Sequence, residues 1–299
     1  MKKFLILTFV IQILFFSSCE DALKLYPPDG LIDAEFWQNK EDVESVLMAA
    51  YKNLAQLDER LFYYGELRGD MLIEDRNLNG HLRNIKDGNI YPENPFASWN
   101  PFYNVINNCN LVLKYSPGVR KLDPTFTDYR YNTFRAEAIF LRSLTYFYMI
   151  RIWKDVPFIL KAYDSDNQDF FVSKTDGNVI IDSLKIQLNR ILNIIPKDHE
   201  TLERTRGRAT HGAVNALLAD IALWDFEYQE CITYIQAIED NEMYELLPGG
   251  QWFTIFSEGN TLEGIFEIQF DGDLGQNNSL YGVTRQQSNN FLASTFAMD

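Results

Sequence analysis

The feature that most constrains the fold is a long apolar segment at residues 134–160, which reads FRAEAIFLRSLTYFYMIRIWKDVPFIL. Apolar residues recur there at steps of three and four, which is the spacing of one face of a helix. That stripe comprises Phe134, Ala138, Leu141, Leu144, Tyr148 and Ile152, and a second apolar set comprises Ile139, Phe140, Phe147, Ile150 and Trp153. A helix that is apolar on more than one side must be covered on more than one side. The sequence therefore predicts a central helix packed on several faces, which Asp155 and Pro157 bring to an end.

Helical spacing recurs on both sides of this segment, in residues 43–54, 99–113, 179–195 and 209–224, and residues 227–241 are expected to pair antiparallel with the last of these. Residues 57–98 are polar and irregular, and long loops on a helical scaffold tend to carry function. After residue 250, Phe266, Ile268 and Phe270 alternate with polar residues, which is strand periodicity. The chain is therefore expected to be mainly α, with long loops and a small β element near its C-terminus.

Charge and cysteine content exclude several classes of protein. The 299 residues carry 42 acidic and 27 basic side chains, for a formal charge of −15, and a field of that sign repels nucleic acid. The three cysteines have neither the spacing of metal ligands nor that of a disulfide framework. No zinc, phosphate-loop or nucleophile motif occurs, so no metal, no cofactor and no enzymatic activity are expected.

The first 19 residues read as a targeting segment. Lys2 and Lys3 precede an apolar run, Phe4 to Phe16, that is shorter than the ~20 residues needed to span a bilayer. Ser17 and Ser18 then precede Cys19, as at a bacterial lipoprotein cleavage site. We expect residues 1–18 to be a signal peptide and Cys19 to be acylated, palmitate being one such chain. The alternative is an ordinary signal peptide cut near Ser18, which leaves a free thiol.

Three segments together resemble the SusD/RagB family of glycan-binding outer-membrane lipoproteins. They are PPDGLIDAEFWQNKEDVESVLMAAYKNL, then RAEAIFLRSLTYF with the following Asp155-Val156-Pro157, and RATHGAVNALLADIALW. The resemblance implies a tetratricopeptide-like, right-handed scaffold of helical pairs, although the strict repeat signature is absent. It also implies a helical domain at 19–225 and an incomplete start of the family's second half at 226–299, because family members are usually much longer.

The resemblance also implies a ligand site. In the family a tryptophan and a nearby asparagine often border the glycan, and Trp99 and Asn104 occupy the matching positions. A nearby polar loop offers further hydrogen-bonding side chains, Asp75, Arg76, Asn77 and His81. The competing interpretation is that Trp99 only packs the start of its helix and that the loop is solvated surface.

The family would place the protein on the cell surface, anchored by lipid in the outer membrane, where it hands oligosaccharide to a SusC-like TonB-dependent transporter. Two other functions stay open at this point. A tetratricopeptide-like scaffold can be a protein-interaction adaptor. An all-helical glycoside hydrolase needs only two suitably spaced carboxylates, and 42 acidic residues make accidental pairs common.

Overall fold

The structure, a computed structural model, describes residues 36–74, 78–284 and 291–295. The expected signal peptide and Cys19 lie outside these residues. The chain divides into two compact units, residues 1–38 and 39–299. In the first unit, residues 36–38 form a short turn in which the Phe36 ring lies edge-on to Trp37, with 5.1 Å between centroids.

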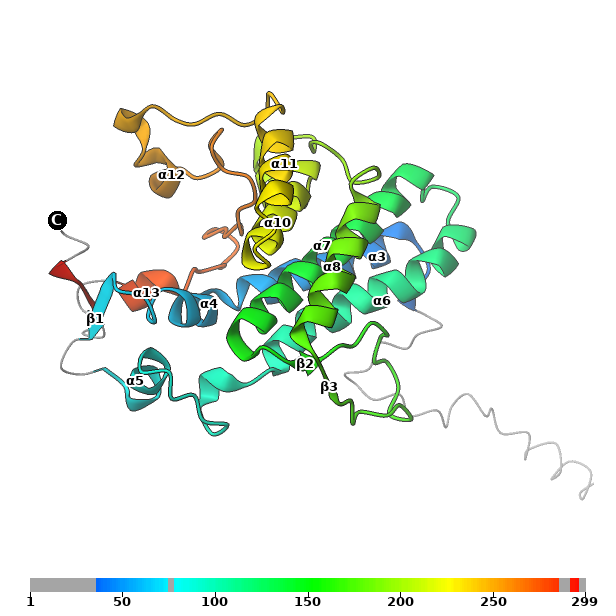
Figure 1. The fold of residues 1–299 in the computed structure, drawn as a ribbon. Coiled ribbons are helices and arrows are strands. Elements are labelled where there is room, and N and C mark those ends of the chain that lie inside the picture. Colours follow the sequence, from blue (N-terminus) through cyan, green and yellow to red (C-terminus); the bar gives the residue numbers. More distant parts are fainter. Residues whose placement is uncertain (1–35, 75–77, 285–290, 296–299) are drawn as a thin grey trace, which may run out of the picture. The chain divides into compact units, whose positions relative to one another are not determined.

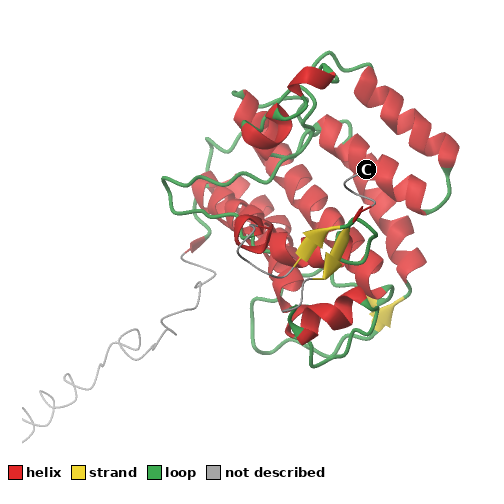
Figure 2. Cartoon of the chain, turned by 90° about the vertical axis from the view of Figure 1, so that its left-hand side faces the viewer, coloured by secondary structure: helices red, strands yellow, loops and turns green. Residues whose placement is uncertain are grey.

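The second unit is mainly helical, as expected, and its strands are few and short (Figures 1 and 2). Its longer helices are α3 (Lys40–Ala55), α6 (Asn100–Leu122), α7 (Asp128–Trp153), α8 (Gly177–Ile191), α10 (His211–Trp224) and α11 (Tyr228–Glu239). Its shorter helices are α4 (Asp58–Gly65), α5 (Gly80–Lys86), α9 (Leu202–Gly207), α12 (Thr254–Ser257) and α13 (Leu280–Thr284), with 3-10 turns η2 (Pro95–Ala97) and η3 (Gly249–Gln251). Within the described ranges, each helix is too short or too polar to cross a bilayer.

Helix α7 is the central helix that its sequence predicts. It packs against α6, α8, α3 and α10, and 14 of its 26 residues are buried, on more than one face. It begins earlier than the apolar stripe, at Asp128, because the Thr127 hydroxyl accepts a hydrogen bond from the Arg130 N–H and caps the helix. It ends at Trp153, where Lys154 adopts a positive φ of 65°, and Asp155 and Pro157 follow.

The remaining long helices form packed pairs. Helix α3 lies along α6, α6 along α7, α7 along α8, and α10 along α11 (Figure 1). Helix α3 starts with a capping box, in which the Asn39 side chain accepts from the Asp42 N–H and the Asp42 carboxylate accepts from the Asn39 N–H. The expected pairing of residues 209–224 with 227–241 is the α10–α11 hairpin.

The small β element near the C-terminus is present, but not where strand periodicity placed it. Strand β4 (Phe291–Ala293) pairs antiparallel with β1 (Leu72–Glu74), whereas residues 266–270 form no strand. The Phe266 ring instead packs on the helices, 5.1 Å from the Phe140 centroid, and the Glu267 N–H donates to the Arg206 carbonyl. The alternation of residues 266–270 therefore reflects packing on helices rather than pairing in a sheet.

A buried ion pair joins three helices. The Glu137 side chain on α7 is fully buried and accepts two hydrogen bonds, both 2.9 Å long, from the Arg208 guanidinium. Arg208 also donates to Glu44 of α3 at 3.1 Å, and the Tyr51 hydroxyl of α3 donates to Glu137 at 2.6 Å. Burial alone would lower the pKa of Arg208, but the charge of Glu137 and the hydrogen bonds to it raise that pKa overall. Since Arg208 caps the end of α9, three residues before α10 begins at His211, this network ties α3, α7 and the α9–α10 connection together.

A second buried charge on α7 positions a loop. The Arg142 guanidinium donates to Asn110 Oδ1 of α6 and to Gln187 Oε1 of α8, each at 2.6 Å. The Asn110 amide in turn donates to the carbonyls of Ile159 and Lys161, at 3.2 and 3.0 Å. These two residues belong to the loop between β2 (Val156–Pro157) and β3 (Lys174–Thr175), whose antiparallel pairing closes the loop at its base.

We expect Glu137→Gln to destabilise the fold strongly. The buried Arg208 guanidinium would then keep only one carboxylate partner, the partly exposed Glu44. Breaking a buried pair from one side costs ~3–5 kcal/mol. The measurement is the free energy of unfolding in urea, followed by circular dichroism. Glu44→Gln is the matched control, since 32% of the Glu44 side chain is exposed, and such pairs contribute at most ~1 kcal/mol. Equal losses in the two variants would contradict the central role of Glu137.

Asn110→Ala should loosen the β2–β3 loop, because it removes both donors to the loop carbonyls and the acceptor of Arg142. We expect faster hydrogen exchange in residues 157–163 and a loss of ~2 kcal/mol of stability. Asn108→Ala is the control, because this half-buried side chain on the same helix makes no hydrogen bond within the described residues. Unchanged exchange in the loop of Asn110→Ala would contradict this account of its positioning.

Candidate functional site: two cavities that share Trp99

A cleft of about 740 Å³, here called the Trp99 cleft, lies between the first turns of α6 and the β2–β3 loop. One face of α6 presents the lining residues Trp99, Asn100, Tyr103, Asn104, Ile106, Asn107 and Asn110. The loop supplies Pro157, Ile159, Tyr163, Phe170, Phe171, Val172 and Ser173. The α6 residues recur at steps of three and four, so a single helical face forms one wall.

Hydrogen bonds between α6 and the loop hold the two walls together. The Asn107 amide donates to the Tyr163 carbonyl at 2.9 Å, and its oxygen accepts from the Tyr163 N–H at 2.7 Å. The Tyr103 hydroxyl donates to the Pro157 carbonyl at 2.6 Å. Burial raises the pKa of Tyr103 well above its ordinary value, so the phenol stays a neutral donor. The polar groups at the back of the cleft are thus committed to its structure.

The groups toward the mouth of the cleft are available to a ligand. The Asn100 and Asn104 side chains are exposed, and neither makes a hydrogen bond within the described residues. Each amide offers two donors and one acceptor, which suits pairs of neighbouring hydroxyls. Phe170 stacks on Tyr163, with centroids 5.1 Å apart and planes inclined by 23°, while the Phe171 side chain is 96% exposed. The mouth thus combines amides with exposed aromatic faces, and none of the described residues that line it is charged.

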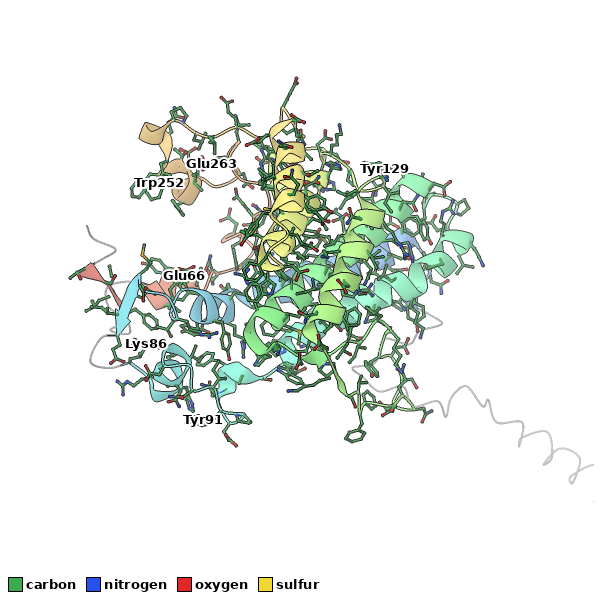
Figure 3. The ribbon with its side chains drawn as sticks, viewed as in Figure 1. Glu66, Lys86, Tyr91, Tyr129, Trp252 and Glu263 are labelled. Carbon is green, nitrogen blue, oxygen red and sulfur yellow. The ribbon has the colours of Figure 1, made fainter. Side chains whose placement is uncertain are left out.

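A second cavity of about 1000 Å³ adjoins the first and shares Trp99 with it; we call it the Trp153 cavity. It is lined by Ile90, Tyr91, Pro92, Ala97, Trp99, Ile150, Arg151, Ile152, Trp153, Lys154, Lys174, Gly177, Asn178, Ile181 and Trp224. The Trp99 ring lies edge-on to Trp153, with 6.2 Å between centroids, and Lys174 Nζ lies 5.3 Å from the Trp99 centroid. Tyr91, on the segment that leads into α6, is 55% exposed at the edge of this cavity (Figure 3).

The structure brings together two of the six ligand residues that the sequence predicts. Trp99 and Asn104 line the same cleft. His81 lies at the start of α5, where its N–H donates to the Asn79 side chain, and it lines neither cavity. Asp75, Arg76 and Asn77 lie outside the described residues. Trp99 is half-buried and also contacts Tyr103, so packing and ligand contact are compatible for this residue.

Sequence reasoning missed the residues of the β2–β3 loop. Residues 161–177 contain four aspartates and no predicted ligand residue, yet Tyr163, Phe170 and Phe171 form much of the outer wall of the Trp99 cleft. Two adjacent phenylalanines in an otherwise polar loop were the available signal, because large aromatic side chains in a loop need a partner or a ligand. Within the described residues, no group of three or more His, Cys, Asp or Glu side chains is arranged to hold a metal ion.

Comparison with known proteins is consistent with this geometry. The profile of a SusD-like family, described as starch-binding and associating with the outer membrane, matches residues 29–223. SusD-like protein P38 of Formosa agariphila is 24% identical over 308 residues, covering 91% of this chain and 58% of its own. Three such relatives from that organism are covered to between 52% and 58%, so this chain spans about half of their length.

Solved structures share the fold. A SusD superfamily protein from Bacteroides thetaiotaomicron superposes with a TM-score of 0.75 at 16% identity, covering 87% of this chain and 61% of the other. Surface glycan-binding protein A from the same organism, in complex with laminarihexaose, gives a TM-score of 0.65 at 20% identity, covering 78% and 50%. Since the family profile covers more than half of the residues, the chain belongs to the SusD-like family.

Proposed function

We propose that this protein binds oligosaccharide at the cell surface and delivers it to a SusC-like TonB-dependent transporter in the outer membrane. The observation that carries the proposal is the Trp99 cleft, which places an indole beside two exposed, unengaged amides. An aromatic face can stack on the C–H face of a pyranose, while the amides pair with its hydroxyls. A solved relative of the same fold is described in complex with laminarihexaose, which supports a glucan-type ligand among those to be tested.

The mechanism is binding and release without chemistry. Glycoside hydrolysis generally requires a pair of carboxyl groups that flank the scissile bond. In the described part of the chain, no Asp or Glu lines the Trp99 cleft or the Trp153 cavity. An affinity between micromolar and millimolar, equivalent to about −8 to −4 kcal/mol, suits capture followed by transfer.

The proposal extends to the chain's organisation. Residues 1–18 act as a lipoprotein signal peptide, and an acylated Cys19 anchors the protein in the outer membrane. Residues 19–225 form the helical domain that holds the Trp99 cleft, and residues 226–299 belong to a second half of the kind found in the longer relatives. Family membership supports this division, since the profile ends at residue 223, just before the α10–α11 connection.

Trp99→Ala should weaken binding of laminarihexaose or maltohexaose about tenfold, equivalent to ~1.4 kcal/mol, because the stacking surface is lost. Asn104→Ala should lose about fivefold, the value of one net hydrogen bond of ~1 kcal/mol. Calorimetry measures both affinities, and melting temperatures show whether each variant is folded. Trp252→Ala is the control, because this half-exposed tryptophan lines neither cavity and lies near the top of the view in Figure 3, whereas Tyr91 lies near the bottom. Equal effects at Trp99 and Trp252 would argue against a specific site.

Cys19→Ser should move the protein from the membrane fraction to the soluble periplasmic or extracellular fraction. The substitution removes the proposed site of acylation, and stable anchoring needs two or more acyl chains. The measurement is fractionation of cells, together with mass spectrometry of the N-terminal peptide. Cys231→Ser serves as the matched control, since this partly exposed cysteine lies within α11. An unmodified Cys19 in wild-type protein would contradict the anchor.

A further inference from the structure

The two cavities that share Trp99 differ sharply in charge. Every side chain that lines the Trp99 cleft is neutral. Among the described residues, the Trp153 cavity is lined by three cationic side chains, Arg151, Lys154 and Lys174, and by no carboxylate. The chain as a whole carries 42 acidic and 27 basic residues, so acidic side chains would be expected to outnumber basic ones in an average cavity of this protein. A cationic cavity in this protein is therefore a local exception that calls for a ligand of opposite charge.

Two of these cations form no ion pair within the described residues. Arg151 is paired with Asp220 at 3.2 Å and lies over the Trp224 ring. Lys154 and Lys174, by contrast, have no carboxylate within ion-pair distance in the described residues. Their neighbours in sequence do not neutralise them directly, since Asp155 accepts from the Gly177 N–H at 3.1 Å and the next acid, at position 176, caps α8. An anion that enters the cavity would thus meet two ammonium groups that have no carboxylate partner among the described residues, and the one on Lys174 lies over the Trp99 ring.

The backbone determines where both lysines lie. Lys154 caps the end of α7 with a φ of 65°, and Lys174 pairs with Pro157 across the β2–β3 ladder. Gly177 packs so closely on this corner that a Cβ there would lie 2.6 Å from the Lys154 carbonyl oxygen. The two lysines are therefore fixed to rigid elements rather than to a free loop, which favours a defined binding geometry.

Aromatic walls complete the cavity. Trp99 and Trp153 lie edge-on to each other, and Tyr91 and Trp224 add further ring surface. Aromatic faces beside unpaired ammonium groups suit a ring-shaped ligand that carries a negative charge. A free inorganic anion would use the lysines but not the indoles, and a neutral sugar would use the indoles but not the lysines.

We propose that the Trp153 cavity binds an acidic sugar unit, bearing a carboxylate or a sulfate ester, of an oligosaccharide whose adjacent neutral unit occupies the Trp99 cleft. This inference rests on the proposed glycan binding and specifies its substrate class. Trp99 forms the wall between the two subsites, so a single chain of sugars can touch both.

The test compares the affinities of the purified protein for laminarihexaose, hexagalacturonate and a kappa-carrageenan oligosaccharide of similar length. We expect one of the two acidic ligands to bind about tenfold tighter than the neutral one at low salt, because hydrogen bonds to charged groups are stronger than those to neutral groups. Which acidic ligand binds identifies the charged group as carboxylate or sulfate. The preference should shrink in 0.5 M NaCl, where exposed charges are screened.

Lys154→Gln and Lys174→Gln should each lower the acidic-to-neutral affinity ratio about tenfold, which corresponds to one charge-assisted hydrogen bond of ~1.4 kcal/mol. Both lysines are exposed, so melting temperatures should stay unchanged. Lys121→Gln makes the same charge change near the far end of α6, roughly 30 Å away by helical rise, and should leave the ratio unchanged.

The outcomes separate this inference from the proposed function. The acidic subsite would be overturned if neutral ligands bound as tightly as acidic ones and neither lysine substitution changed the acidic-to-neutral affinity ratio. That result would leave the proposed glycan binding intact. Equal effects of Lys121→Gln and the cavity variants would also overturn it, since the effect would then be net charge. Absence of binding to every saccharide by folded protein would refute both.

Discussion

Helix α7 is buried on more than one face between residues 133 and 150, and two charged residues buried there tie it to the rest of the bundle. A buried charge is costly unless it is paired and hydrogen-bonded. Glu137 meets this requirement through Arg208 and Tyr51, and Arg142 meets it through the side-chain oxygens of Asn110 and Gln187. The partners of the two charges lie in different parts of the chain. Through Glu137, α7 is linked to α3 and Arg208, and through Arg142 and Asn110 it is linked to the β2–β3 loop at the site.

The two networks have different consequences. The Glu137 network joins α3, α7 and the α9–α10 connection, which are distant in sequence, and so restricts how these helices pack. The Arg142 network has no carboxylate partner among the described residues; burial lowers the pKa of its guanidinium, which is held by neutral oxygens. Because Asn110 is held by Arg142, its amide is aimed at the β2–β3 loop. The shape of the Trp99 cleft is thus coupled to the packing of α7.

The site divides its polar groups between structure and binding. At the back of the cleft, Tyr103, Asn107 and Asn110 are saturated by loop carbonyls and N–H groups. At the mouth, Asn100 and Asn104 are exposed and unengaged. This division allows a rigid cleft to present a few free donors and acceptors, which limits the entropy lost when a flexible oligosaccharide binds. The adjoining cationic cavity adds a charge preference without adding charge to the cleft itself.

Much of the fold could be predicted from local patterns. The stripe along residues 134–153 and the helical spacing of residues 99–113, which include Trp99 and Asn104, both depend on spacing within a few residues. Periodicity misled at residues 266–270, because alternating apolar residues pack on helices as well as they pair in a sheet. The pattern alone cannot show which surface they meet.

By itself, the sequence determined the mainly helical class, the central buried helix and the acidic balance, since these follow from composition and short-range order. The family resemblance rests on three matching segments of the sequence. Only the tertiary structure decided which carboxylate pairs with Arg208, which loop faces α6, and that Lys154 and Lys174 border one cavity with Trp99. The physical reason is that ion pairs and cavities join residues far apart in the chain: Glu137 and Arg208 are 71 positions apart. Their meeting depends on how whole helices pack, and no local spacing encodes it.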